Sequence, residues 1–330
     1  MKPFKAFRIQ VTDGKVNAGI ESITLNDLSP GDVLIKSVYS SINYKDALAA
    51  TGSGQILKKP CLVGGIDVAG YVETSSSPRF HRGDQVLVCG AGLSETCDGG
   101  FSEFVRVPAE KVIAVPEGLS LFEVMAMGTA GFTAALAVHQ LQLNGQRPEW
   151  GAILVTGASG GVGSYAIDIL SALGYQVVAS TSRLQNTAYL ESLGASKVLS
   201  SDTLSIGNAP LEKGLWGGAV DSVGGELLCG LTRTVKPMGN IAVIGLTGGI
   251  KLETTVLPFI LRGINLLGIN SVSCAHELKV TIWQRLATDF RPTHIDKIVT
   301  AEITMNQLAD SFDAYIQGRH SGRTVLRIAD

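Results

Sequence analysis

Residues 151–164, GAILVTGASGGVGS, contain the pattern that decides the fold of this chain. A short apolar run with the length of a buried strand is followed by a glycine-rich turn at 157–163, and a helix-like segment ends at Gly174. Glycines at such a turn let backbone N–H groups reach a pyrophosphate, and the helix N-terminus stabilises its charge. A glycine triplet alone also occurs in flexible turns, so the flanking strand and helix are what indicate a nucleotide site.

Strand-like and helix-like segments alternate after this turn as far as residue 272. Apolar strands are predicted at 175–181, 218–223 and 240–246, with helical segments such as 226–235 between them. Alternation of this kind is typical of a parallel, doubly wound sheet. We therefore expect an α/β chain with a Rossmann dinucleotide-binding domain over residues 125–272.

The first part of the chain has a different character. Short strand-like runs at 32–42, 67–73 and 83–90 lie between Gly- and Pro-containing turns, which predicts an antiparallel, barrel-like β domain. The last segment carries a helix and ends in a strand-like run, and we expect it to return to the first domain. Residues 1–124 and 273–330 are therefore predicted to form one β-rich domain.

Composition excludes several classes of protein. The 330 residues are 45% hydrophobic and 17% charged, with a net charge of −2, which supports a large core and excludes the basic surface of a nucleic-acid or membrane-surface binder. The five cysteines are odd in number and lack CxxC spacing, as expected of reduced thiols. The N-terminus lacks a signal-peptide pattern, and we predict no membrane span and a cytoplasmic location.

The end of the second predicted strand indicates the cofactor. NAD enzymes usually carry an acidic residue there that binds the ribose 2′-hydroxyl. Here the chain has no carboxylate, and Arg183 can pair with the 2′-phosphate of NADPH with help from the hydroxyls of Ser180, Thr181 and Ser182. The alternative is a solvated arginine that precedes a helix.

Four segments together resemble the zinc-independent quinone-reductase branch of the medium-chain dehydrogenases/reductases. They are SSINYKDAL (40–48), GIDVAGYV (65–72), GTAGFTA (128–134) and GASGGVG (157–163). The segments NYKD (43–46), PRF (78–80) and PFILR (258–262) are similar to the YhdH/AcuI group, which comprises acryloyl-CoA reductases also described as quinone oxidoreductases.

The resemblance implies a GroES-like catalytic domain, a Rossmann domain, NADPH as reductant and a homodimer. It also implies a cofactor that contacts residues of the glycine turn, of the second strand and of later strand ends: Ser159, Gly160, Gly161, Val162, Thr181, Ser182, Arg183, Leu246, Ile260 and Ser271. For the last three the alternatives are core packing and, for Ser271, a loop hydroxyl. Thr129 contacts the nicotinamide end or packs a helix, and Arg323 reaches a phosphate or is a surface charge.

The zinc alcohol dehydrogenases of this architecture use a cysteine and a Gly-His-Glu motif at positions that match 41–43 and 65–67 here. Ile66 cannot bind a metal, and the chain has no four-cysteine lobe. Cys61, Cys89 and Cys97 with His81 fit no common ligand spacing. We expect an enzyme that works without zinc.

Without a metal, other groups must stabilise the charge that forms on the substrate. Hydride addition to the β carbon of an enoyl thioester builds an enolate, whose oxygen needs hydrogen-bond donors. Tyr44 is the first candidate as donor or as a residue that orients substrate and cofactor, Asn43 is a carbonyl donor and Asp46 an orienting residue. The alternatives are a packed aromatic ring for Tyr44 and a helix cap for Asp46.

The sequence therefore predicts an NADPH-dependent reductase of a short 2-enoyl-CoA, with acryloyl-CoA as the substrate and no metal. The first alternative is an NADPH:quinone oxidoreductase, which shares the cofactor half of the site. An alternative of another class is a non-catalytic NADPH-binding protein, because the fold alone does not establish turnover.

Overall fold

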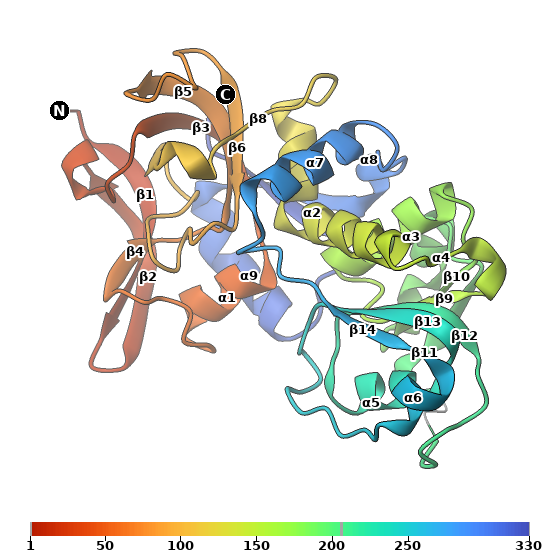
Figure 1. The fold of residues 1–330 in the computed structure, drawn as a ribbon. Coiled ribbons are helices and arrows are strands. Elements are labelled where there is room, and N and C mark those ends of the chain that lie inside the picture. Colours follow the sequence, from red (N-terminus) through yellow and green to blue (C-terminus); the bar gives the residue numbers. More distant parts are fainter. Residues whose placement is uncertain (1, 205–206, 330) are drawn as a thin grey trace. The chain divides into compact units, whose positions relative to one another are not determined.

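The structure is a computed structural model that describes residues 2–204 and 207–329. It divides into two compact units (Figure 1). Unit 1 contains the described residues up to Thr129, Val272–Ala287 and those from Val299 onward, and unit 2 contains Ala130–Ser271 and Thr288–Ile298. Each unit has its own sheets and its own core.

Unit 1 is built on two sheets. The smaller has three strands in the order β2-β1-β4: β1 (Phe4–Thr12), β2 (Lys15–Ile23) and β4 (Cys61–Val63). The larger has the order β15-β16-β3-β5-β6-β8, with β7 also paired to β3: β3 (Val33–Ser41), β5 (Asp67–Ser75), β6 (Gln85–Cys89), β7 (Phe104–Val107), β8 (Ile113–Ala114), β15 (Val299–Thr304) and β16 (Arg323–Arg327). All pairs are antiparallel except β15 with β16.

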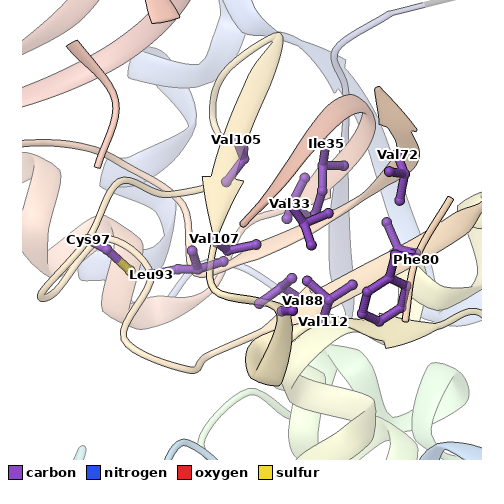
Figure 2. Close-up of a cluster of buried hydrophobic side chains, with 13 residues drawn as sticks. Val33, Ile35, Val72, Phe80, Val88, Leu93, Cys97, Val105, Val107 and Val112 are labelled. Atoms are coloured by element: carbon purple, nitrogen blue, oxygen red, sulfur yellow. The ribbon is translucent and has the colours of Figure 1, made fainter. Parts of the chain in front are cut away.

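The helices of unit 1 are few. Those that lie wholly within it are α1 (Tyr44–Thr51), α7 (His276–Ala287) and α9 (Leu308–Ile316). Alternate residues of β3, β5, β6 and β7 point to one side of the larger sheet and form a valine-rich core, which Figure 2 shows. Its members Val33, Val88 and Val105 have no exposed surface, and burying each such side chain contributes about 1.5–3 kcal/mol.

Unit 2 contains a six-stranded sheet in the order β11-β10-β9-β12-β13-β14, with every pair parallel (Figure 1). The strands are β9 (Ile153–Val155), β10 (Val177–Thr181), β11 (Lys197–Ser200), β12 (Trp216–Asp221), β13 (Val235–Val243) and β14 (Asn265–Gly268). The helices are α3 (Gly161–Ala172), α4 (Thr187–Ser192), α5 (Gly225–Thr234), α6 (Leu257–Arg262) and α8 (Ile295–Ile298). The prediction of a parallel, doubly wound sheet is confirmed.

Helix α2 (Leu121–Leu143) begins in unit 1 and ends in unit 2. It is bent at Gly128, whose φ of 50° and ψ of −151° are not helical. By length and composition this helix could cross a membrane, which differs from the sequence analysis, but 83% of its apolar window is buried in the protein. An apolar helix that is covered by its own fold is typical of a protein core.

The limits of the two units differ from the predicted domain limits. The sequence analysis places domain boundaries after residues 124 and 272. In the structure, the chain passes from one compact unit to the other after Thr129 and after Ser271. Residues 288–298 were assigned to the first domain, but they belong to unit 2. The reason is a buried carboxylate on α3: Asp168 accepts hydrogen bonds from Thr293 Oγ1 at 2.7 Å and from the backbone N–H of His294 at 3.0 Å.

Candidate functional site

The glycine turn lies between β9 and α3, as predicted. Gly157 has a φ of +58°, which favours glycine, and a Cβ atom at Gly163 would lie 2.6 Å from the carbonyl oxygen of Gly157. Gly160 is the N-cap of α3 with a φ of −79°, so its backbone does not require glycine. The N–H groups that follow it, those of Gly161 and Val162, have no acceptor within the first helical turn. They form an anion-binding end of the kind that holds a pyrophosphate.

Arg183, Ser159 and Thr181 converge beside this turn. Arg183 Nη2 donates to Ser159 Oγ at 2.8 Å, and the Arg183 backbone N–H donates to Thr181 Oγ1 at 3.1 Å. Ser159 Oγ and Thr181 Oγ1 are 3.2 Å apart. Partial burial lowers the pKa of the Arg183 guanidinium, which stays charged at neutral pH. The sequence alternative of a fully solvated arginine does not fit this geometry.

The other hydroxyls of this strand end differ in access. Ser182 lies just after the end of β10 and is exposed, but Ser180 lies within β10 and has 0% exposed surface. Its Oγ has no hydrogen-bond partner in the described part of the protein. The prediction that Ser180 binds a phosphate therefore differs from the structure, since its side chain points into the fold.

A buried carboxylate supports the turn from the neighbouring strand. Asp221, at the end of β12, accepts from Thr156 Oγ1 at 2.6 Å and from the Gly224 N–H at 2.8 Å. Burial raises the pKa of Asp221. Thr156 Oγ1 also accepts from the Ser222 N–H at 3.0 Å, so the carboxyl ends of β9 and β12 are joined. The sequence analysis missed this pair, although an Asp followed by two glycines at 224 and 225 was visible in it.

The three late positions lie after β13 and β14 and on α6. Leu246 and Ile260 are 60% and 69% exposed, which excludes the alternative that they are core residues. Ser271 is half-buried, three residues after the end of β14. Arg262, whose segment carried the resemblance, donates to the carbonyl oxygens of Arg233 at 2.6 Å and Val235 at 3.1 Å, so it caps the end of α5.

Unit 1 contains a buried polar network centred on Asp67. The Asp67 carboxylate accepts from Ser41 Oγ at 2.8 Å and Asn43 Nδ2 at 2.7 Å. It also accepts from Thr129 Oγ1 at 2.6 Å and from the Thr129 N–H at 3.0 Å. Thr129 is thus a support for Asp67 at the bend of α2. Asp67 itself has 0% exposed surface, and a buried charge of this kind requires a partner.

Arg323 on β16 is that partner. Its Nη2 lies 3.7 Å from Asp67 Oδ2 and donates to Ser41 Oγ at 2.7 Å. Nη1 donates to the Ile42 carbonyl at 2.9 Å and to Asn43 Oδ1 at 3.0 Å, and Nε donates to a backbone carbonyl at 3.1 Å. With 2% of its surface exposed and its donors engaged, Arg323 neither reaches a phosphate nor lies on the surface. Both sequence expectations for Arg323 are therefore corrected.

The NYKD segment begins α1, and its residues have separate roles. Asn43 precedes the helix and is held by Asp67 and Arg323. Asp46 accepts from the backbone N–H groups of Asn43 at 2.8 Å and Ile66 at 2.9 Å. Burial, and then the Asp67 carboxylate, raise the pKa of Asp46 to about 7. Tyr44 is 40% exposed, so it is not the packed aromatic residue of the alternative interpretation.

The positions at which zinc relatives place ligands are occupied by this network. Ser41 donates to Asp67, and Ile66 is 3% exposed with its N–H bound to Asp46. Among residues 2–204 and 207–329, no group of three or more His, Cys, Asp or Glu side chains is arranged to hold a metal ion. The Asp67 network offers oriented hydrogen bonds and the buried ion pair of Arg323 with Asp67.

Comparison with known proteins gives two family matches. Residues 29–117 match the alcohol dehydrogenase GroES-like domain, and residues 161–288 match the family described as zinc-binding dehydrogenase. These matches confirm a GroES-like domain combined with a Rossmann-type domain.

Three proteins are similar over nearly the whole chain. "Putative quinone oxidoreductase YhfP" of Bacillus subtilis is 43% identical over 98% of this chain and 99% of its own, and a crystal structure of B. subtilis yhfP with NAD bound has a TM-score of 0.96. "Probable acrylyl-CoA reductase AcuI" of Escherichia coli is 43% identical over 98% of this chain and 99% of its own. The yhdH oxidoreductase of Salmonella enterica in complex with NADP has a TM-score of 0.95 at 43% identity, covering 98% and 100% of the two chains.

Proposed function

Because this chain belongs to the medium-chain dehydrogenase/reductase superfamily, we propose that it reduces the carbon–carbon double bond of a short 2-enoyl-CoA, with acryloyl-CoA as substrate and NADPH as reductant. The observation that carries the proposal is the 43% identity with an AcuI protein over 98% of this chain. The arrangement of the polar network in unit 1 and of Arg183 in unit 2 is compatible with it.

The residues present fit NADPH. The backbone N–H groups of Gly161 and Val162 at the N-terminus of α3 can hold the pyrophosphate. Arg183, with Thr181 and Ser159, can hold the 2′-phosphate. Leu246, Ile260 and Ser271 remain proposed contacts along the later strand ends. When bound, NADPH would supply the hydride for the reaction.

The chain's own residues would stabilise charge on the substrate. Tyr44 is 40% exposed, and its hydroxyl can donate to the thioester oxygen, where negative charge develops during reduction. The side-chain amide of Asn43 is oriented by Asp67 and Arg323, which fixes its N–H groups before substrate binds. Asp46 acts through backbone hydrogen bonds to Asn43 and Ile66, so it is a positioning residue. We further propose that none of these steps requires zinc.

One assay separates this function from its alternatives. NADPH oxidation is measured with acryloyl-CoA, crotonoyl-CoA and a quinone under identical conditions. Efficient turnover of acryloyl-CoA with little quinone reduction is expected. Reduction of quinone alone would favour the second candidate, which the equal similarity to YhfP supports. Tight NADPH binding without turnover of any substrate would favour the non-catalytic alternative.

We also propose a homodimer in the cytoplasm. Strand β14 is at the edge of the unit 2 sheet, and unit 2 also has large exposed apolar side chains, among them Ile250 at 84% and Val256 at 67%. A strand at the edge of a sheet and exposed apolar side chains each support contact with a second copy. Sedimentation analysis is expected to give twice the chain mass, and Ile250→Lys should lower that value toward the monomer.

A further inference from the structure

Unit 1 contains a cavity of about 320 Å³ that the proposed reaction does not use. Three segments line it: the PRF segment after β5, residues 112–116 around β8, and α7. Phe80, Val112 and Trp283 in its walls are 6%, 0% and 1% exposed, so packing holds them in place. Figure 2 shows Phe80 and Val112 as members of the valine-rich core. None of the described residues that line the cavity belongs to the Asp67 network.

The polar groups of the cavity give it a positive charge. Arg79 Nη2 lies 3.0 Å from His276 Nε2, and the Arg79 guanidinium carbon lies 5.4 Å from the centre of the Phe80 ring. Since arginine only donates hydrogen bonds, His276 Nε2 is the acceptor and the imidazole is neutral in this arrangement. In the described part of the chain Arg79 pairs with no carboxylate, and no acidic side chain is among the residues that line the cavity.

We propose that this cavity binds a small organic anion, namely a carboxylate that carries one aromatic ring or a short alkyl chain. The volume is at the lower end of the range for small-molecule sites, which are mostly apolar with a few fixed polar groups. The apolar body would pack against Phe80 and Trp283. The planar guanidinium of Arg79, already placed by His276 and the Phe80 ring, would pair with the carboxylate.

The ligand chemistry is tested with para-fluorobenzoate, followed by fluorine NMR, with and without saturating NADPH. Saturable binding with a Kd of about 1 mM is expected, because a ligand of this size reaches that affinity at the usual binding free energy per non-hydrogen atom. The neutral isostere para-fluorobenzamide should bind at least about tenfold more weakly, because it lacks the charge that Arg79 recognises. Absence of saturable benzoate binding to the wild-type protein would overturn the proposal.

Three variants locate the site. Arg79→Gln should weaken benzoate binding about tenfold, and Val280→Phe, which fills the cavity, should abolish it. Arg82→Gln is the matched control, because Arg82 is an exposed arginine of the same turn that pairs with Glu73 at 3.3 Å. Unchanged binding in both Arg79→Gln and Val280→Phe would overturn the assignment. Acryloyl-CoA turnover is measured in parallel, so that failure of the proposed reaction is seen separately from failure of the anion site.

Discussion

Arg183 should determine the choice between NADPH and NADH. A hydrogen bond to a charged partner is worth roughly 1.5–3 kcal/mol, so Arg183→Ala should weaken NADPH binding about ten- to a hundredfold. NADH lacks the 2′-phosphate and should bind almost as before. Dissociation constants of both cofactors are measured for wild type, Arg183→Ala and the exposed control Lys197→Ala. Equal weakening of NADPH and NADH would assign Arg183 to support of the Ser159 turn.

Tyr44 should affect turnover more than cofactor binding. The hydroxyl of this half-exposed residue is the proposed donor to the thioester oxygen, and loss of one such donor typically lowers the rate about 10²–10³-fold. We expect Tyr44→Phe to lower kcat with acryloyl-CoA while the NADPH dissociation constant changes little. Tyr71→Phe, another exposed tyrosine of unit 1, is the control. Unchanged kcat and kcat/KM in Tyr44→Phe would exclude the donor role.

Asp46 should make the stability of the protein depend on pH. Its pKa in the fold is about 7 and its ordinary value is 3.8, so the folded state binds the proton more tightly than the unfolded state. This contribution is fully present below about pH 4 and is lost as pH rises through about 7; its size is of the order of 4 kcal/mol. Asp46→Asn should flatten the free energy of unfolding between these pH values. The exposed control Asp310→Asn should not, and an unchanged slope in Asp46→Asn would contradict the assignment.

At the scale of the element, the turn from β9 to α3 should tolerate side chains unequally. A Cβ at Gly163 would meet backbone atoms at 2.6–2.7 Å, so Gly163→Ala should cost about 1–3 kcal/mol of stability and weaken NADPH binding. Gly160 has an ordinary φ, and a Cβ there would lie 3.3 Å from the carbonyl oxygen of Gly157. We therefore expect Gly160→Val to fold with unchanged stability and to lose only its affinity for NADPH. Thermal unfolding and NADPH titration check both, with Gly19→Ala as control. Full NADPH affinity in a folded Gly160→Val would place the phosphate elsewhere.

Elements set by local pattern could be predicted from the sequence, and contacts between distant segments could not. The strand predicted at 175–181 is present as β10, which ends at Thr181, two residues before Arg183. The family inferred from the glycine turn and the NYKD segment is confirmed by the comparisons. Arg323, however, binds Ile42 across 281 positions, and no local pattern indicates such a pair. The pair of Asp221 and Thr156 was missed for the same reason, since Asp221 ends β12 and Thr156 directly follows β9.

At the scale of the whole molecule, catalysis should be independent of bound metal. The expectation rests on Ile66 and Ser41 at the positions of zinc ligands and on their hydrogen bonds to Asp46 and Asp67. Elemental analysis of active protein should find zinc far below one atom per chain, and treatment with a chelator should leave acryloyl-CoA turnover unchanged. Stoichiometric zinc whose removal abolishes turnover would contradict the prediction.

The position of β16 has a consequence for the order in which the protein is made. This strand lies between β15 and β3 in the larger sheet of unit 1, yet it is synthesised only after all the strands of unit 2. Unit 2 has most of its residues in one continuous stretch and can form its core while synthesis continues. Unit 1 has high contact order, because its sheet stays split until β16 arrives. Until β16 is made, the nascent chain holds Asp67 without the charge of Arg323, so the polar network of unit 1 can form only after unit 2 has been synthesised.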